Sequence, residues 1–329
     1  MAGAFYPADP GRCRAVAQAL LQVPPGQPDI PHGWGGIVPH AGWICSGAIA
    51  GRTLGMLARG PAPDVVVVFG AVHTPIDIRT AALDSHATWA VPNGTHEIAR
   101  DLAEQLARSS SRFITDDRFH AHEHAVEVEL PLIHSVWPGS RLLPVEVPVV
   151  DDAPDIGRQT ARVILDAGLR PVFLASSDLT HYGPAYDFTP AGVGIEALQW
   201  AKENDRRLLR LVENFEIDRV VPEARQHLNA CGPGAIAAML AACKESGATA
   251  ARVLRHANSY QTLAEVAPQE PVDAVGYAAV VVTCSGKLSD RPTLPDGNMR
   301  PGPADQSHKV AVRLRRPGNR RNNTPAPYC

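Results

Sequence analysis

Two kinds of segment alternate along the chain: short apolar runs and longer stretches in which apolar and polar residues are mixed. Short runs rich in β-branched residues predict strands, and they cover residues 37–38, 65–69, 141–147, 172–175 and 275–282. Longer amphipathic stretches rich in Ala and Leu predict helices between them, and they cover residues 13–21, 46–58, 96–107, 155–167, 191–212 and 234–245. Because the run VVVVF shows no alternation, its strand is expected to be buried on both faces. The pattern predicts an α/β protein with three layers, α/β/α, around a mixed, mostly parallel sheet.

The last part of the chain has a different composition. Residues 285–329 contain nine Lys/Arg, three Asp/Glu and seven Pro, a balance of +6 against −9 for the remainder. Such a segment cannot bury enough apolar surface to offset the entropy of ordering. We therefore expect a single domain over residues 1–284 and a basic, Pro-rich disordered tail over 285–329. A solvated tail accounts for its arginines better than contact with nucleic acid or an acidic partner.

Composition excludes several classes of protein. Of the 329 residues, 45% are hydrophobic and only 5% aromatic, which gives no support for a base-stacking nucleic-acid platform. Apolar runs of eighteen or more residues are absent, so a membrane-spanning helix is not expected. The N-terminal residues lack the basic start and apolar core of a secretory signal. The six cysteines form no CxxC pair, which argues against a zinc ribbon or disulfide framework and favours a cytoplasmic location.

Candidate chemistry lies where the predicted strands end. His40 follows the run GGIV, and His73 follows VVVVFG. Asp178 and His181 follow the run PVFLAS. In open α/β sheets, ligand sites form beyond the carboxyl ends of the strands. Histidines at three such ends predict a shared site, because imidazoles from different strands can bind one iron, zinc or copper ion.

Cys231 is a further candidate ligand. It lies in the motif NACGPG, which opens an Ala-rich helix. The dipole at a helix N-terminus favours the thiolate, which is the form of cysteine that binds metals. Taken alone, such a cysteine is more often a small buried residue. Together with His40 and His73, we interpret it as a metal ligand.

The segment HAHEHAVE, residues 120–127, is also rich in potential ligands. It matches neither HExxH nor its inverse, so a zincin helix is not supported. We expect His124 and Glu127 to share one face of a helix in a supporting or capping role. The chain lacks a phosphate loop, a dinucleotide fingerprint and a nucleophile elbow.

Seven short motifs occur in the order found in one protein family. They are MAGAFYPADPGRC, PHAGWICSGAIAG, FGAVHT, HEHAVEVELPLI, SSDLTHYG, NACGPGAI and VGYAAVV. Over residues 2–283 the chain resembles the Memo family, which includes AmmeMemoRadiSam system protein B and is similar in fold to class III extradiol ring-cleavage dioxygenases. The resemblance implies a metal pocket of two histidines and one cysteine, here His40, His73 and Cys231. It also implies that Asp178 and His181 line this pocket, with His181 as the acid/base.

The resemblance sets the functional expectation. It implies a non-haem metal oxygenase-like enzyme acting with O₂ on a small phenolic, catecholic or indolic molecule or a modified peptide. Fe(II) is the expected metal, although a thiolate in place of the usual carboxylate also suits Cu or Zn. Partners of the AMMECR1-like or radical-SAM type are implied as well. Two alternatives stay open: a non-catalytic metal- or peptide-binding protein, and a zinc-dependent hydrolase with Asp178 or His181 as base.

Overall fold

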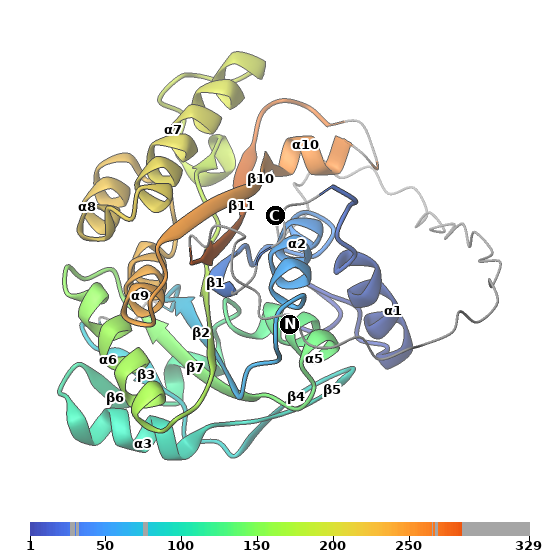
Figure 1. The fold of residues 1–329 in the computed structure, drawn as a ribbon. Coiled ribbons are helices and arrows are strands. Elements are labelled where there is room, and N and C mark those ends of the chain that lie inside the picture. The colour runs from blue at the N-terminus through green and yellow to red at the C-terminus, as the bar shows by residue number, and fades with distance from the viewer. Residues whose placement is uncertain (27–29, 31–32, 75–77, 265, 267–268, 285–329) are drawn as a thin grey trace. The chain divides into compact units, whose positions relative to one another are not determined.

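A nine-stranded mixed sheet forms the centre of the protein (Figure 1). The computed structural model describes residues 1–26, 30, 33–74, 78–264, 266 and 269–284. The main path of the sheet runs in the order β10 (Ala250–Asn258), β11 (Ala274–Thr283), β1 (Gly33–Val38), β8 (Pro171–Ser176), β2 (Val65–Ala71), β7 (Arg141–Val147), β3 (Ala81–Leu83), β6 (Phe113–Thr115). The short β9 (His181–Tyr182) pairs with β11 outside this path.

The four central strands, β1, β8, β2 and β7, are parallel. Antiparallel pairs flank them, between β1 and β11 on one side and between β7 and β3 on the other. In β2, Val65, Val67 and Phe69 pack into one hydrophobic cluster, whereas Val66 and Val68 pack into another. Every residue of β2 is buried, because helices cover both faces of the sheet. This is the burial that its unbroken valine run predicts.

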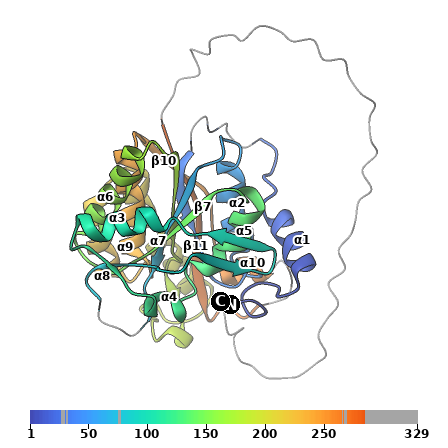
Figure 2. The same cartoon turned by 90° about the horizontal axis from the view of Figure 1, so that it is seen from below.

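The helices form two layers, one on each face of the sheet (Figures 1 and 2). One layer contains α1 (Pro10–Leu20), α2 (Gly47–Leu57) and α5 (Leu130–Val136). The other contains α3 (Arg100–Ser109), α6 (Ala153–Asp166), α7 (Ile195–Glu213), α8 (Ile217–His227) and α9 (Pro233–Glu245). The smaller elements are the hairpin β4 (Thr88–Val91) and β5 (Gly94–Glu97), the helices α4 (Arg118–Ala121) and α10 (Ser259–Ala264), and the 3₁₀ turns η1 (Glu127–Glu129) and η2 (Pro184–Tyr186). The predicted three-layer α/β/α fold with a mixed sheet is confirmed.

Local differences have local causes. Residues 96–99 were expected to begin a helix, but His96 lies in β5 because a turn at Pro92 and Asn93 folds this stretch back onto β4. The helix expected from residue 191 begins instead at Ile195. Gly192 and Gly194 precede it with φ of 77° and 112°, a left-handed backbone that a right-handed helix cannot include. The hydrophobic pattern predicted neither β10 nor α8.

No helix within the described ranges is long and apolar enough to cross a membrane. The last described strand, β11, ends at Thr283, lies between β10 and β1, and is buried along almost its whole length. Residues 285–329 lie outside the described residues. The domain boundary after residue 284 and the disorder of the tail therefore stay predictions.

Candidate metal centre

The carboxyl ends of β1, β8 and β2 lie side by side at one edge of the sheet. These three strands are parallel neighbours, so the residues that follow them meet there. His40 follows β1 and His73 follows β2, and their ring centroids lie 5.1 Å apart. The strand-end pattern in the sequence therefore brings these two histidines together, as expected.

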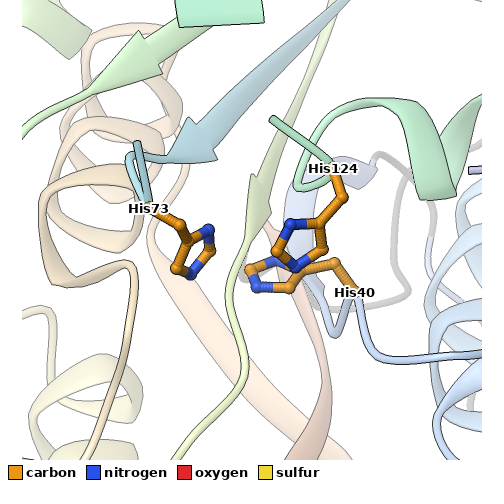
Figure 3. A group of neighbouring side chains, drawn as sticks. All are labelled: His40, His73 and His124. Carbon is orange, nitrogen blue, oxygen red and sulfur yellow. The ribbon is translucent and has the colours of Figure 1, made fainter. Parts of the chain in front are cut away.

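His124 joins them from a different part of the chain. Its ring centroid lies 5.1 Å from that of His40 and 4.8 Å from that of His73 (Figure 3). One ring nitrogen from each histidine falls in a group whose members lie within 4.8 Å of one another. His124 lies in the turn before η1, so the expected helix face shared with Glu127 does not form.

The hydrogen bonds of His40 determine which of its nitrogens is free. Its Nδ1 lies 2.9 Å from Oγ of Ser176, the last residue of β8. The Ser176 hydroxyl donates its own proton to the carbonyl of Ala125. The serine oxygen must therefore accept from His40, so Nδ1 carries the proton and Nε2 carries the lone pair.

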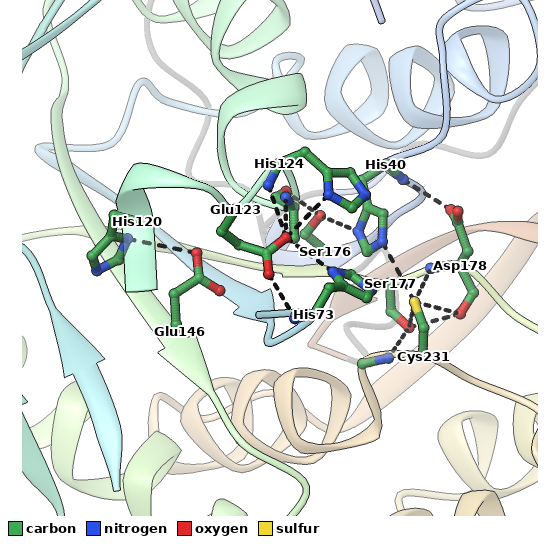
Figure 4. Close-up of polar contacts among 12 residues, drawn as sticks. His40, His73, His120, Glu123, His124, Glu146, Ser176, Ser177, Asp178 and Cys231 are labelled. Atoms are coloured by element: carbon green, nitrogen blue, oxygen red, sulfur yellow. Dashed lines mark hydrogen bonds and ion pairs between the residues drawn. The ribbon is translucent and has the colours of Figure 1, made fainter. Parts of the chain in front are cut away.

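Glu123 binds the Nδ1 atoms of two further rings, those of His73 and His124. Its Oε1 accepts from Nδ1 of His73 at 2.9 Å, and Nδ1 of His124 lies 3.2 Å from the same oxygen. Its Oε2 accepts the backbone N–H of His73 at 2.6 Å, and Oε1 accepts the backbone N–H of His124 at 2.8 Å (Figure 4). Burial acts to raise the pKa of Glu123, but the bonds from both histidines outweigh it and hold the pKa well below its usual range. A buried carboxylate is therefore kept anionic behind the rings.

His181 is oriented by the backbone. Its Nδ1 donates to the carbonyl of Leu179 at 3.1 Å, which leaves Nε2 as an acceptor. Its ring lies edge-on to Tyr186, with the centroids 5.2 Å apart. Burial, together with the charges of His73 and His124, lowers the pKa of His181 to about 4, although this hydrogen bond opposes the change. His181 is therefore a neutral imidazole at pH 7.

Asp178 holds the loop of a neighbouring strand. Its Oδ1 accepts the backbone N–H of His40 at 2.9 Å. We expected it to orient His181 or the substrate, whereas this bond directs its carboxylate to the segment that carries His40. Burial raises the pKa of Asp178 to about 6, although the bond from His40 opposes the rise.

Cys231 lies against the same loops. Its Sγ is 3.4 Å from Nε2 of His40, and it accepts the backbone N–H of Asp178 at 3.3 Å (Figure 4). The helix that follows, α9, packs closely against the segment after β7 because Gly234 has no side chain: a Cβ there would lie 2.2 Å from the carbonyl oxygen of Pro148. The motif NACGPG thus brings a sulfur atom next to the imidazoles.

The groups around His73 stabilise the protonated, positively charged form of its ring. Burial acts to lower the pKa of His73, but hydrogen bonds to Cys231 and Glu123 outweigh it and raise the pKa to about 11. By contrast, burial holds the pKa of His40 well below its usual range, and the charge of His73 lowers it further. The site therefore stabilises positive charge on His73, between the sulfur of Cys231 and the carboxylate of Glu123. A metal ion can replace the proton there, because metal binding to histidine displaces protons.

The donor set fits a borderline metal. Imidazole nitrogens and a thiolate suit iron, copper or zinc better than magnesium or calcium. The outer nitrogen of each ring is hydrogen-bonded, which is typical of histidines that bind metals. A second group, Asp84, His86 and Asp117, also has ligand atoms within 4.8 Å. There, however, Asp84 already accepts from the His86 ring and Asp117 from Ser85.

The structure brings together four of the five residues selected from the sequence, namely His40, His73, Asp178 and Cys231, and the charges of His73 and His124 act on the fifth, His181. Sequence reasoning missed three others that complete the arrangement. Glu123 and His124 belong to the segment 120–127, which was noted for its many potential ligands. The sequence did not show that this segment lies next to His40 and His73. Ser176 gave no signal, because a serine at the end of a strand is common.

Comparison with known proteins adds independent information. A family model described as Memo-like protein matches residues 1–281. A MEMO1 family protein of Methanosarcina barkeri is 31% identical over 86% of this chain and 98% of its own length. A MEMO1 family protein of Methanopyrus kandleri is 30% identical over 85% of this chain and 96% of its own length.

Proposed function

Since this chain belongs to the Memo-like protein family, we propose that it is a metal-dependent enzyme of the non-haem oxygenase type. Its substrate is a small phenolic, catecholic or indolic molecule or a modified peptide, and O₂ is the co-substrate. Fe(II) is the preferred metal. Copper and zinc are the alternatives that the thiolate allows.

The observation that carries the proposal is the shared orientation of the histidines. His40, His73 and His181 each donate with Nδ1 to a fixed acceptor, so each ring directs Nε2 into the site, and His73 offers its Nε2 lone pair once a metal ion has displaced the proton there. We assign His40, His73 and Cys231 as the metal ligands. The 3.4 Å between Nε2 of His40 and Sγ of Cys231 is a reasonable separation for two atoms bound to one ion, at roughly 2.0–2.1 Å for nitrogen and 2.3 Å for sulfur.

The remaining residues have roles in positioning and proton transfer. Glu123 fixes the ring of His73 and stays anionic. His181 accepts a proton from substrate at Nε2, because burial keeps its ring neutral. Asp178 fixes the backbone of His40. Iron, when bound, supplies redox chemistry with O₂ and Lewis acidity toward an ionisable substrate oxygen.

Anaerobic purification followed by metal analysis and oxygen uptake tests the proposal. We expect about one iron per chain and substrate-dependent oxygen consumption with a member of a phenol and indole panel. A protein that holds zinc and hydrolyses a substrate without consuming oxygen would overturn it in favour of a hydrolase. Absence of turnover across the panel with every metal would favour a binding protein.

A further inference from the structure

Helix α7 carries two adjacent polar residues on its buried side, Asn204 and Asp205. Their exposed fractions are 3% and 1%. A buried amide or carboxylate is costly unless it is hydrogen-bonded. Asp205 bonds to the loop that carries His181, and Asn204 bonds both to that loop and to the segment that carries Cys231.

Asp205 holds the turn between β8 and β9. Its Oδ1 accepts the backbone N–H of Thr180 at 2.9 Å, and its Oδ2 accepts from Nε2 of His256 on β10 at 2.8 Å. The carboxylate reaches this position only because residue 276 is glycine, where a Cβ would lie 2.3 Å from Oδ2. Gly276 also donates its N–H to the carbonyl of Thr180 at 2.9 Å. Thr180, the neighbour of His181, is thus held on both sides of its backbone.

Asn204 connects the same turn to the loop of Cys231. Its Nδ2 donates to Oγ1 of Thr180 at 3.2 Å and to the carbonyl of His227 at 2.8 Å. Its backbone carbonyl accepts from Nδ2 of Asn229 at 3.0 Å. Asn229 is fully buried and lies two residues before Cys231. One turn of α7 therefore contacts both loops.

The loop of Cys231 has a feature that calls for such support. Leu228, which ends α8, has a φ of 50°, a left-handed conformation that is costly for a residue with a branched side chain. Such a conformation persists only where the surroundings over-determine it. Asn204 makes hydrogen bonds to the residues on either side of Leu228, His227 and Asn229, and these bonds hold Leu228 in its left-handed conformation.

We propose that Asn204 and Asp205 are positioning residues, which fix the loop of His181 relative to the loop of Cys231 from behind the candidate metal centre. The inference rests on the proposed function for the roles of His181 and Cys231. Displacement of a reacting group by about 1 Å can cost on the order of 10²-fold in rate, so such support has a catalytic consequence. The two residues touch neither the imidazole of His181 nor the sulfur, and they act through Thr180 and Asn229.

The test compares Asn204→Leu with Glu203→Gln, a matched control on the exposed side of α7. Amide hydrogen exchange of residues 178–183 and 228–232 and the alkylation rate of Cys231 are measured by peptide mass spectrometry on metal-free protein. We expect Asn204→Leu to raise all three rates about tenfold, as loss of buried hydrogen bonds opens these loops locally. Peptides from β2 and β7 should be unchanged, and Glu203→Gln should match the original protein.

Two further measurements separate positioning from general support. The Co(II) form of Asn204→Leu should show an altered thiolate-to-metal absorption band. Thr180→Val, which removes only the hydroxyl that Asn204 binds, should raise exchange in 178–183 more than in 228–232. This second variant also answers the question if Asn204→Leu fails to fold.

Two outcomes overturn the inference: equal acceleration of exchange across the whole sheet, or an unchanged cobalt spectrum despite faster loop exchange. Exchange and alkylation need neither bound metal nor substrate. Failure of these readouts therefore sinks the inference alone, whereas a protein that binds no metal sinks the proposed function alone.

Discussion

Glu123 contacts His73 twice, through the ring Nδ1 at 2.9 Å and through the backbone N–H at 2.6 Å. The carboxylate thereby fixes both the position of the residue and the orientation of its ring. It is buried and remains anionic, so its charge acts on whatever cation the ring binds. This relationship separates the candidate metal centre from a chance cluster of histidines.

Glu123→Gln should weaken metal binding while the fold persists. The amide keeps the size of the side chain but removes the negative charge and one acceptor oxygen. Loss of an outer partner of a metal-binding histidine costs about 10- to 100-fold in affinity. Competition titration with a chelating dye measures the metal affinity. The control is Glu104→Gln, at an exposed position of α3. Equal affinities in the two variants would contradict the role given to Glu123.

His40→Ala and His73→Ala should each remove most of the bound metal and leave the fold near native. Both residues lie in loops beyond strand ends, which contribute little to the core. His124→Ala should retain more metal than either, because we assign the third coordination position to Cys231. Metal analysis after dialysis, with circular dichroism for the fold, compares the three. Greater loss in His124→Ala would make the three-histidine group the true ligand set.

His181→Ala should retain metal and lose turnover by about 10²- to 10⁴-fold, the usual contribution of a general acid or base. Because the pKa of His181 is lowered to about 4, its ring stays neutral across pH 5–8. Titration of His181 should therefore cause no loss of activity near pH 6.5. The pH profiles of the original protein and of His181→Ala should have the same shape in this range. Loss of metal from this variant would reassign His181 as a ligand.

Much of the fold could be predicted from the sequence, because buried parallel strands and amphipathic helices leave strong periodic signals. Valine runs located β2, and the residues just beyond the strands located His40, His73 and His181. The position of His124 could not be predicted, since the turn that carries it has no periodicity and its approach depends on tertiary contacts. The roles of Ser176 and Asn204 could not be predicted for a related reason. Each acts through hydrogen bonds to residues distant in the sequence, and such bonds are recognised only once the folded structure places the two groups side by side.

A pH effect on stability should be traceable to His96, which lies outside the candidate metal centre. Burial lowers the pKa of His96 to about 4, although its bond to the carbonyl of Leu130 opposes the change. Below its ordinary pKa of 6.5 the unfolded chain takes up a proton that the folded protein excludes. Stability from this residue is therefore complete above pH 6.5 and is lost as the pH falls to 4.

His96→Gln removes this dependence. Relative to the variant, the original protein should lose up to about 3 kcal/mol of unfolding free energy between pH 7 and pH 4. Urea unfolding of both proteins across this range measures the difference, and the difference at pH 7.5 provides the baseline. Parallel curves would show that His96 has the same pKa in the folded protein as in the unfolded chain, and would contradict the lowered value.

The sharpest prediction concerns Cys231. As a thiolate ligand it should give a sulfur-to-metal charge-transfer band in the Cu(II) form and should make the Fe(II) form oxygen-sensitive. Cys231→Ser replaces an anionic donor by a neutral hydroxyl, so metal affinity should fall and the band should vanish. Cys231→Asp restores an anionic donor and should retain some iron without the band.

Cys243 provides the control for this experiment, because it is a fully buried thiol within α9 and away from the imidazoles. Cys243→Ser should leave the band and the metal stoichiometry intact even if it lowers stability. If Cys231→Ser instead keeps full metal affinity and the same visible spectrum, the sulfur is only packed at the start of a helix. The anionic ligand would then be absent from the site, and with it most of the case for iron.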